Sequence, residues 1–332
     1  MRHAVDITDP SAVAESRRLA RGLAASARLD ATRAEALAIV VTEMATNLLR
    51  HAGGGQLLLQ AQPGAGRRVT LAAIDSGPGI PDIDLALSDG FSTGSSAGGG
   101  LGAMRRLADS FEIRSTPGRG TVAVCGFGAP PVMAGVEVGA FLVNYPGDRA
   151  CGDGVFARDV AGRVDLMAVD GLGHGARAEA AAEEAIAGLS GLRGDDPSGI
   201  LSELSTRLAG SRGSVAALAQ IEAADGRLRL AGIGNIAALL VQPGGQVRRL
   251  ISREGRLGGA VRQPPVETAT MRPGDVLILH SDGLSTLRSH TDLPATAGMS
   301  CAMIAAHLIR DRNKGRDDCC ALVARLAPEN IA

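Results

Sequence analysis

The chain has 332 residues, and its formal net charge is −1. Hydrophobic residues make up 45% of it, aromatic residues make up 2%, and Lys314 is the only lysine. This length accommodates two domains with cores of their own, and the balanced charge gives no electrostatic reason to expect a nucleic acid or an acidic surface as partner. A lysine-dependent phosphate loop is excluded, because no GxxxxGKS or GxxxxGKT sequence occurs.

The cysteines and the hydropathy pattern favour a soluble cytoplasmic protein. Five cysteines occur without a CxxC pair or a zinc-ligand spacing, which is typical of free thiols in a reducing compartment. The opening residues, MRHAVDITDP, lack the apolar stretch of a signal peptide. Apolar runs fall short of the ~20 residues that a membrane helix needs, so we expect no membrane association.

The first 130 residues predict a compact unit of helices and strands. Asp30 precedes a long helical pattern as its N-cap, and three glycines, 53–55, end it. Residues 76–100 are rich in Gly, Ser, Pro and Asp, which indicates a long loop of the kind that carries function. The expected elements are strands over 2–8, 56–62, 67–75, 111–116 and 120–128, and helices over 11–29, 32–52 and 102–110.

A change of pattern follows Ala129-Pro130-Pro131, where consecutive prolines favour a stiff linker. We therefore expect one domain over residues 1–129 and a second over 133–328. Strands separated by Asp-Gly, Gly-Gly and Pro-Gly turns dominate the second domain, as in a β-sandwich. They are expected near 136–144, 154–160, 163–169, 214–222, 227–234, 236–242, 247–251, 266–271, 275–281 and 320–326, with helices near 174–189, 197–209 and 299–311.

Glu43 and Asn47 are the first candidate functional pair, because their i,i+4 spacing places both on one helix face. Most pairs of this kind form a solvated helix edge. These two stand beside an apolar stripe of residues expected to be buried, which are Ile39, Val40, Val41, Met44 and Leu48. An Asn that holds a divalent cation, beside a Glu that orients or deprotonates a nucleophile, would explain their place there.

Two glycine-rich segments follow the pair. Asp75-Ser76-Gly77-Pro78-Gly79 ends a strand with an acid that can accept from an exocyclic amine, and its glycines allow close approach to a flat ring. Gly98-Gly99-Gly100-Leu101-Gly102 then opens a helix, whose exposed amides favour phosphate. Either segment alone is weak evidence, and a flexible linker is the simpler reading of a glycine run.

The ordered set EMATNLLRHA, DSGPGI, GGGLG and GRGTVAV resembles the GHKL (Bergerat) ATP-binding family, nearest to anti-sigma-factor serine kinases of the RsbT and SpoIIAB type. The resemblance covers about residues 1–128 and implies an α/β sandwich. It implies that Asn47 holds Mg²⁺, that Asp75 reads adenine, that Glu43 is the base toward a protein serine and that residues 88–102 form the ATP lid. It implies a packing role for His51. It also implies nucleotide contacts by Gly77, Gly79, Gly100, Gly102 and Thr121.

A second group of acids occupies the edges of apolar runs in the C-terminal half. Asp153, Asp170, Asp282 and the pair Asp317-Asp318 all have this position. Carboxylates gathered at one end of a sandwich repel each other unless cations neutralise them, and oxygen-only ligands suit Mg²⁺ or Mn²⁺. Two such ions with a bridging water make a nucleophile for attack on a phosphoryl group. Independent turn aspartates are the alternative for any one of these acids.

The order of these acids resembles the metal-dependent PPM protein phosphatases of the small SpoIIE and RsbX branch, over about residues 134–327, and implies an αββα sandwich. LRLAGIGNIAALLV and GRLGG fill the places of its AGHNP-like and GxPLG-like turns. The resemblance implies that Asp153 and Asp170 bridge two metals, with Asp170 and Asp282 essential to catalysis. It implies a complete metal set of Asp153, Asp170, Gly171 through its carbonyl, Asp282 and Asp317, with Asp318 nearby.

Three departures from the phosphatase pattern concern substrate contacts rather than metal ligands. Leu172 stands where many members carry a histidine, and His174 comes two residues later, so a general-acid histidine is in doubt. Gly232-Ile233-Gly234-Asn235 lacks the histidine of the AGHNP turn. The final acidic motif continues as Cys319-Cys320 instead of ending in threonine.

Together the two resemblances imply an α+β protein that binds ATP with Mg²⁺ in its first domain and two Mn²⁺ or Mg²⁺ ions in its second. We expect a partner-switching regulator that dephosphorylates a STAS-domain anti-sigma antagonist or a stress-signalling scaffold and phosphorylates the same class of partner. Alternatively, the first domain is a nucleotide-dependent module that holds a sigma factor or scaffold and gates the phosphatase without turnover. A degenerate regulator with neither activity is the third possibility.

Overall fold

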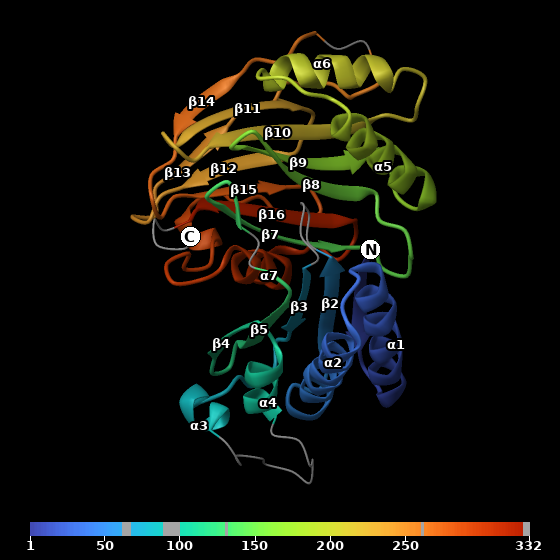
Figure 1. Ribbon diagram of the computed structural model, residues 1–332, viewed down its shortest axis with the longest axis vertical. Coiled ribbons are helices and arrows are strands. Elements are labelled where there is room, and N and C mark those ends of the chain that lie inside the picture. Colours follow the sequence, from blue (N-terminus) through green and yellow to red (C-terminus); the bar gives the residue numbers. More distant parts are fainter. Residues whose placement is uncertain (62–67, 89–99, 130–131, 260–261, 328–332) are drawn as a thin grey trace. The chain divides into compact units, whose positions relative to one another are not determined.

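The computed structural model describes residues 1–61, 68–88, 100–129, 132–259 and 262–327. The chain divides into two compact units, with the division between Pro130 and Pro131. Each unit has its own sheets, helices and core (Figure 1). In the described part of the chain, no helix is both long and apolar enough to cross a membrane.

The N-terminal unit is a helix layer on one antiparallel sheet of order β1-β2-β3-β5-β4. The helices α1 and α2 pack against each other, and α2 contacts β2, β3 and β5. The short α3 and α4 also contact each other, and α4 packs on α2. The elements are β1 Arg2–Ile7, α1 Pro10–Ser26, α2 Ala31–His51, β2 Gly55–Ala61, β3 Val69–Ile74, α3 Ile83–Leu87, α4 Gly100–Leu107, β4 Ser110–Thr116 and β5 Gly120–Phe127.

Helix α2 forms where the sequence predicts it. The carboxylate of Asp30 accepts from the backbone N–H of Arg33 at 2.8 Å, which satisfies a donor at the helix start. Gly53 follows the helix with a φ of +73°, a conformation that glycine adopts without strain. Two expectations were wrong. Ile39 is 40% exposed and not part of the buried stripe, and His51 is exposed and has no packing role.

The C-terminal unit is a sandwich of two antiparallel sheets, with orders β14-β11-β10-β9-β8 and β13-β12-β15-β16-β7-β6. Its elements are β6 Val132–Met133, β7 Val136–Val143, β8 Asp153–Val160, β9 Arg163–Gly171, α5 Ala176–Ser190, α6 Pro197–Arg207, β10 Ser214–Glu222, β11 Arg227–Ile233, β12 Ala237–Val241, β13 Val247–Leu250, β14 Glu267–Thr270, β15 Val276–His280, the 3₁₀ turn His290–Asp292, α7 Cys301–Arg312 and β16 Cys319–Leu326.

Alternation along the strands explains the four layers of this unit. One set of strand residues, such as Leu166 on β9 and Leu279 on β15, fills the core between the sheets. The opposite face of the first sheet packs on α5 and α6, where Val169, Leu189 and Leu204 belong to one buried cluster. Helix α7 covers the outer face of the second sheet, over β7 and β16 (Figure 1). This αββα arrangement, with the α/β N-terminal unit, confirms the expected fold class.

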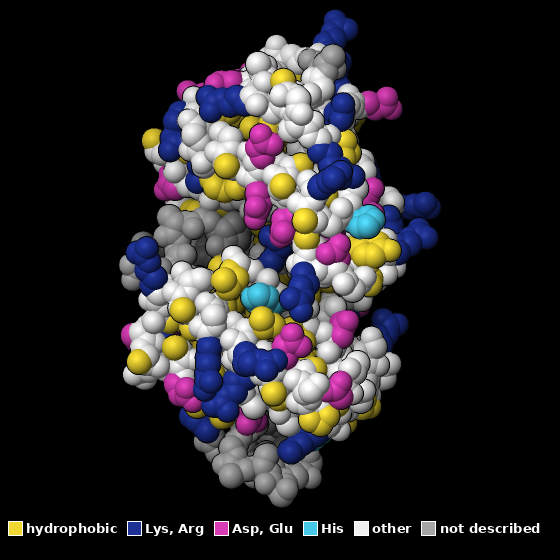
Figure 2. All heavy atoms as spheres, turned by 90° about the vertical axis from the view of Figure 1, so that its right-hand side faces the viewer, with side chains coloured by type: hydrophobic (Ala, Val, Ile, Leu, Met, Phe, Trp, Pro, Cys, Tyr) yellow, Lys and Arg dark blue, Asp and Glu magenta, His cyan; other side chains and the backbone are white. Residues whose placement is uncertain are grey.

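The surface of the protein carries both signs of charge. On the face drawn in Figure 2, acidic and basic side chains are interspersed among uncharged groups. That distribution accords with the net charge of −1. Function therefore has to be sought in local groups of side chains rather than in a field of one sign.

Candidate functional sites

The helix pair of the N-terminal unit, Glu43 and Asn47, lies on α2 with both side chains half-buried. Burial raises the pKa of Glu43, while the positive charge of Arg50 acts in the opposite direction. A carboxylate with a raised pKa holds a proton more readily, as a base needs to do. The roles of Glu43 as base and of Asn47 as Mg²⁺ ligand stay predictions.

Asp75 follows β3 and is held rigidly against β5. Its Oδ1 atom accepts from the backbone N–H of Gly77 at 2.8 Å and of Thr121 at 3.1 Å. Its own N–H donates to the carbonyl of Thr121 at 3.0 Å. These three bonds bring together Asp75, Gly77 and Thr121, as the sequence predicts for a nucleotide site. They leave Oδ2 as the oxygen that takes no hydrogen bond from the described residues.

The glycines of the 75–80 loop are required by close packing. A Cβ atom at Gly77 would lie 2.8 Å from the Cβ of Ala52, which no real pair of side chains tolerates. Gly79 has a φ of +74°, and a Cβ there would overlap the carbonyl of Thr116. The backbone N–H of Ile80 donates to the Ser115 hydroxyl at 2.7 Å, which ties the loop to the β4–β5 hairpin. The loop is thus a fixed platform beside Asp75.

The expected ATP lid is only partly described. Gly100 and Gly102 open α4, and Gly102 is buried within it. Gly98, Gly99 and the rest of 89–99 lie outside the described residues. The nucleotide roles of Gly100 and Gly102 therefore stay predictions.

Strand register places the acids of the C-terminal unit at one end of both sheets. Asp153 begins β8 and is the direct partner of Asp170 near the end of β9. Asp282 follows β15, and Asp317 precedes β16, the strand next to β15. Contacts between β16 and β8 and between β15 and β9 join the two sheets at these strands. The fold therefore brings these four carboxylates toward one another.

Asp153 is the most deeply buried of the four, with 1% of its surface exposed. Burial raises its pKa well above the usual range, and the neighbouring charge of Asp170 raises it further. The hydroxyl of Ser281 donates to Oδ2 of Asp153, and the N–H of Cys320 donates to the Ser281 oxygen at 3.0 Å. Ser281 is thus a supporting residue that the sequence did not reveal, although it directly precedes Asp282.

Asp170 is half-buried and lies among other carboxylates. Burial raises its pKa to about 7, and the charges of Asp282, Asp317 and Asp318 add to the shift. Asp282 is exposed, and its Oδ2 accepts from the side-chain amide of Asn235 at 2.8 Å. Asn235 belongs to the turn that replaces AGHNP, so this turn positions an acid even without the histidine.

Asp318 has a structural role, unlike its neighbour Asp317. Its two oxygens accept from the backbone N–H groups of Tyr145 at 2.7 Å and Gly152 at 2.8 Å. It is buried and serves to hold the loop before β8 in place. Asp317 is partly exposed, and burial raises its pKa, with the charge of Asp282 as the next cause. Asp317 therefore remains the acid that can turn toward Asp170.

Glycines permit the close approach of these segments. A Cβ atom at Gly283 would overlap the carbonyl of Asp318, and one at Gly171 would overlap the carbonyl of Ala178. The buried Gly171 also donates its N–H to the carbonyl of Gly152 at 2.9 Å. Each Asp-Gly pair thus combines an acid with a residue that lets a second segment pack against the backbone.

The donor set fits divalent cations. The pKa values of Asp153, Asp170 and Asp317 are raised by burial and by neighbouring acids. In the described part of the chain, no arginine or lysine side chain forms an ion pair with the four acids, and the Lys314 ammonium donates instead to the carbonyl of Asp282. No three acidic, histidine or cysteine side chains among the described residues already stand at coordination distance.

The surroundings of His174 give no support to a role as general acid. Its side chain is exposed, and its ring stacks on that of Tyr145 with the centroids 4.8 Å apart. Its Nδ1 atom lies 4.0 Å from a carboxylate oxygen of Asp148. The histidine thus belongs to the rim formed by the loops before β8 and before α5.

Comparisons with known proteins match the two units of the chain to two different families. Residues 8–125 match the model of the histidine kinase-like ATPase domain, and residues 161–327 match that of stage II sporulation protein E. The serine/threonine-protein kinase RsbT of Bacillus subtilis is 34% identical over 110 residues, which are 33% of this chain and 83% of RsbT. The phosphoserine phosphatase RsbX of the same organism is 23% identical over 194 residues, 58% of this chain and 96% of RsbX.

Solved structures show the same C-terminal fold. A structure from work on the bacterial stressosome has a TM-score of 0.53 and 29% identity, and the match covers 57% of this chain and 99% of that one. RsbX in complex with magnesium has a TM-score of 0.52 and 22% identity, with 58% and 96% covered. The chain therefore belongs to the SpoIIE family of PPM phosphatases through its C-terminal domain, and carries a histidine kinase-like ATPase domain of the RsbT type in front of it.

Proposed function

We propose that this protein removes phosphate from phosphoserine or phosphothreonine of a STAS-domain partner at a two-cation site, and that its N-terminal domain phosphorylates the same class of partner with ATP. The observation that carries the proposal is the group of Asp153, Asp170, Asp282 and Asp317, which four strands of two sheets bring to one end of the sandwich. Among the described residues, no arginine or lysine side chain forms an ion pair with these acids. The similarity to RsbT, a serine/threonine-protein kinase, and to RsbX, a phosphoserine phosphatase, supports the two opposed activities.

Each acid has a distinct part in the proposed hydrolysis. Two Mn²⁺ or Mg²⁺ ions with a bridging water would supply the nucleophile. Asp153, fixed by Ser281, and Asp170, its partner across the β8–β9 ladder, would hold the inner side of the site. Asp282, oriented by Asn235, and Asp317 would close the solvent side. The carbonyl of Gly171 is the remaining proposed ligand.

The N-terminal domain would bind ATP through the platform around Asp75. Its free oxygen would accept from the adenine amine, while Gly77 and Gly79 let the ring approach. Asn47 would hold Mg²⁺, and Glu43, whose pKa burial raises, would take the proton of a partner serine. Gly100, Gly102 and Thr121 would complete the site.

The test of the phosphatase is release of phosphate from a phosphorylated STAS-domain protein in the presence of Mn²⁺. Asp170→Asn should lose activity by at least about 100-fold, since even the loss of a residue that only supports a metal ligand costs up to that factor. Asp159→Asn is the matched control, because Asp159 lies at the far end of β8 from Asp153, and its carboxylate accepts from the backbone N–H of Gly162. Equal turnover by Asp170→Asn and wild type would refute the metal assignment.

A binding module that gates the phosphatase is the second candidate for the N-terminal domain. The exposed Ile39 lies one helical turn before Glu43 on α2 and offers an apolar contact to a partner beside the proposed base. The two candidates differ in ATP consumption when the STAS-domain partner is added. Turnover of ATP that Glu43→Ala abolishes supports the kinase, and nucleotide-dependent binding without turnover supports the gate.

A further inference from the structure

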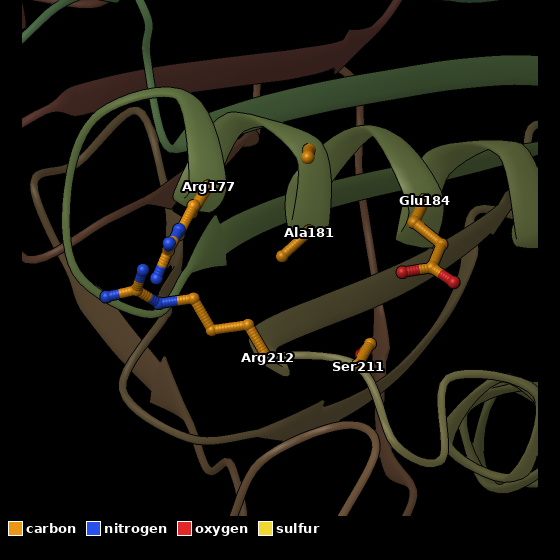
Figure 3. A pocket seen from close by; sticks show the side chains of 6 residues that line it. Arg177, Ala181, Glu184, Ser211 and Arg212 are labelled. Atoms are coloured by element: carbon orange, nitrogen blue, oxygen red, sulfur yellow. The ribbon is translucent and has the colours of Figure 1, made fainter.

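A groove of about 500 Å³ lies in the C-terminal unit between α5 and the loop that precedes β10. Its lining residues are Arg177, Ala180, Ala181, Glu184, Ser211 and Arg212. Figure 3 shows the side chains of Arg177 and Arg212 side by side at one end, with Glu184 on the same helix at the other end. None of these residues is among the acids of the proposed cation site.

The arginine end of the groove adjoins the loop that follows Asp170 and Gly171. The N–H of Leu172 donates to the carbonyl of Gly213 at 3.2 Å, and Ser214 pairs with Gly171 in the β9–β10 ladder. A Cβ atom at Gly173 would lie 2.6 Å from Nη2 of Arg212, so this guanidinium rests against the loop three residues after Asp170. A polypeptide whose phosphorylated residue reached the acids would therefore pass close to the groove.

The two guanidinium groups have no counter-charge of their own. In the described part of the chain, no ion pair or side-chain hydrogen bond satisfies the head of Arg177 or Arg212. A third arginine, Arg256, donates through Nη1 to the carbonyl of Arg212 at 2.9 Å and adds positive charge at the base of the loop. Several other arginines of this unit do have carboxylate partners, such as Arg158 and Arg163 with Asp165.

We infer that this groove binds acidic side chains of the substrate polypeptide that flank its phosphorylated residue, with Arg177 and Arg212 as the docking residues. Two adjacent planar guanidinium groups match carboxylates in bidentate geometry. Glu184 at the other end would repel further acidic residues and so limit the acidic stretch to a short one. The inference rests on the proposed phosphatase function and specifies the substrate class of that same site.

The experiment compares two phosphoserine peptides of equal length, one with aspartates and glutamates on both sides of the phosphoserine and one with asparagines and glutamines. A third substrate, p-nitrophenyl phosphate, has no flanking residues. Wild type should hydrolyse the acidic peptide with a kcat/KM about tenfold higher than the amide peptide, mainly through KM, because each bond to a charged donor contributes on this scale. Raising the ionic strength should reduce this preference.

The double variant Arg177→Gln/Arg212→Gln should lose the preference and keep its activity on p-nitrophenyl phosphate. Arg177→Lys/Arg212→Lys should retain part of the preference, because the charge remains. Arg207→Gln is the matched control, since Arg207 is an exposed α6 residue that pairs with Glu203. It should behave as wild type on all three substrates.

Several results would overturn the inference. The docking role would be refuted if wild type hydrolysed both peptides equally or hydrolysed only p-nitrophenyl phosphate. It would also be refuted if the glutamine variant kept the full preference for the acidic peptide. A parallel fall on p-nitrophenyl phosphate would assign the arginines to the phosphoryl group itself. Absence of wild-type activity on every substrate would refute the proposed phosphatase and the docking site with it.

Discussion

At the scale of single residues, the acids of the C-terminal site lower the stability of the metal-free protein. Asp153 is buried beside Asp170, and the pKa of each is raised by burial and by the other acids nearby. Such a group costs folding free energy when it is ionised and unpaired. Cations would offset that cost, which is why we expect the acids to destabilise the metal-free protein.

The pH dependence of this cost follows from the direction of the pKa shift. The carboxyl of Asp170 keeps its proton up to a pH of about 7 in the folded protein, but loses it near its ordinary value of 3.8 when unfolded. The folded state therefore binds more protons between these values, and the free energy of unfolding falls as pH rises across that window. Above a pH of about 7, Asp170 is ionised in the folded protein, and its full destabilising effect is reached.

We therefore predict that Asp170→Asn, measured with a chelator present, is more stable than wild type at pH 8 by about 2 to 4 kcal/mol. The difference should shrink as the pH is lowered toward 4. Denaturant unfolding of the C-terminal domain at both pH values gives the measurement, with Asp159→Asn as the control. A variant less stable than wild type at pH 8 would show that the acids are not mutually repulsive.

Ser281 gives a second prediction at this scale. Ser281→Ala removes the hydroxyl that donates to the buried Asp153 and accepts from Cys320. We expect the affinity for Mn²⁺ to fall by about 10- to 100-fold, as for other residues that orient a metal ligand. Calorimetric titration measures it, and Ser190→Ala is the control, because the Ser190 hydroxyl bonds only within α5. An unchanged affinity would mean that Asp153 needs no such support.

At the scale of elements, the close approach of β15 and β16 depends on Gly283. Gly283→Ala would push a methyl group into the carbonyl of Asp318 and separate Asp282 from Asp317. We expect a loss of stability of about 1 to 3 kcal/mol, typical of overpacking, together with a loss of phosphatase activity. Gly244→Ala, where a Cβ atom meets no other atom within 4 Å, should change neither. Normal activity in Gly283→Ala would contradict the required approach.

Local sequence patterns predicted most of these elements, because apolar runs and the glycine turns that end them are local signals. Asp170 and Asp282 could be singled out as candidate ligands because each follows an apolar run and directly precedes a glycine. Ile39 was misjudged, because helical periodicity does not show how far a neighbouring sheet extends over a helix. The short α3 within the expected loop over 76–100 was also missed.

Residues that act through tertiary contacts could not be predicted in this way. Ser281 reads as an ordinary turn serine until β8 and β15 are placed on facing sheets. Arg177 and Arg212 are far apart in the chain and meet only through the packing of α5 beside the loop before β10. Asp318 resembles its neighbour Asp317 in sequence, yet its bonds to Tyr145 and Gly152 give it a structural task.

At the scale of the whole molecule, one chain joins a kinase-like ATPase domain to a PPM phosphatase domain. On the proposed account, the first domain adds the phosphate that the second removes, so the phosphorylation of the partner depends on the ratio of the two rates. The N-terminal site then needs ATP, while the C-terminal site needs only divalent cations and water. Removing one activity should expose the other.

The most direct measurement combines the protein with a STAS-domain protein encoded beside it, ATP, Mg²⁺ and Mn²⁺, and follows phosphorylated partner on a phosphate-affinity gel. The account predicts that phosphorylated partner accumulates with Asp170→Asn, does not accumulate with wild type, and fails to form when Glu43→Ala is added to Asp170→Asn. Absence of phosphorylated partner with Asp170→Asn, while wild type still clears a pre-phosphorylated sample, would contradict the kinase role and leave a phosphatase with a nucleotide-binding gate.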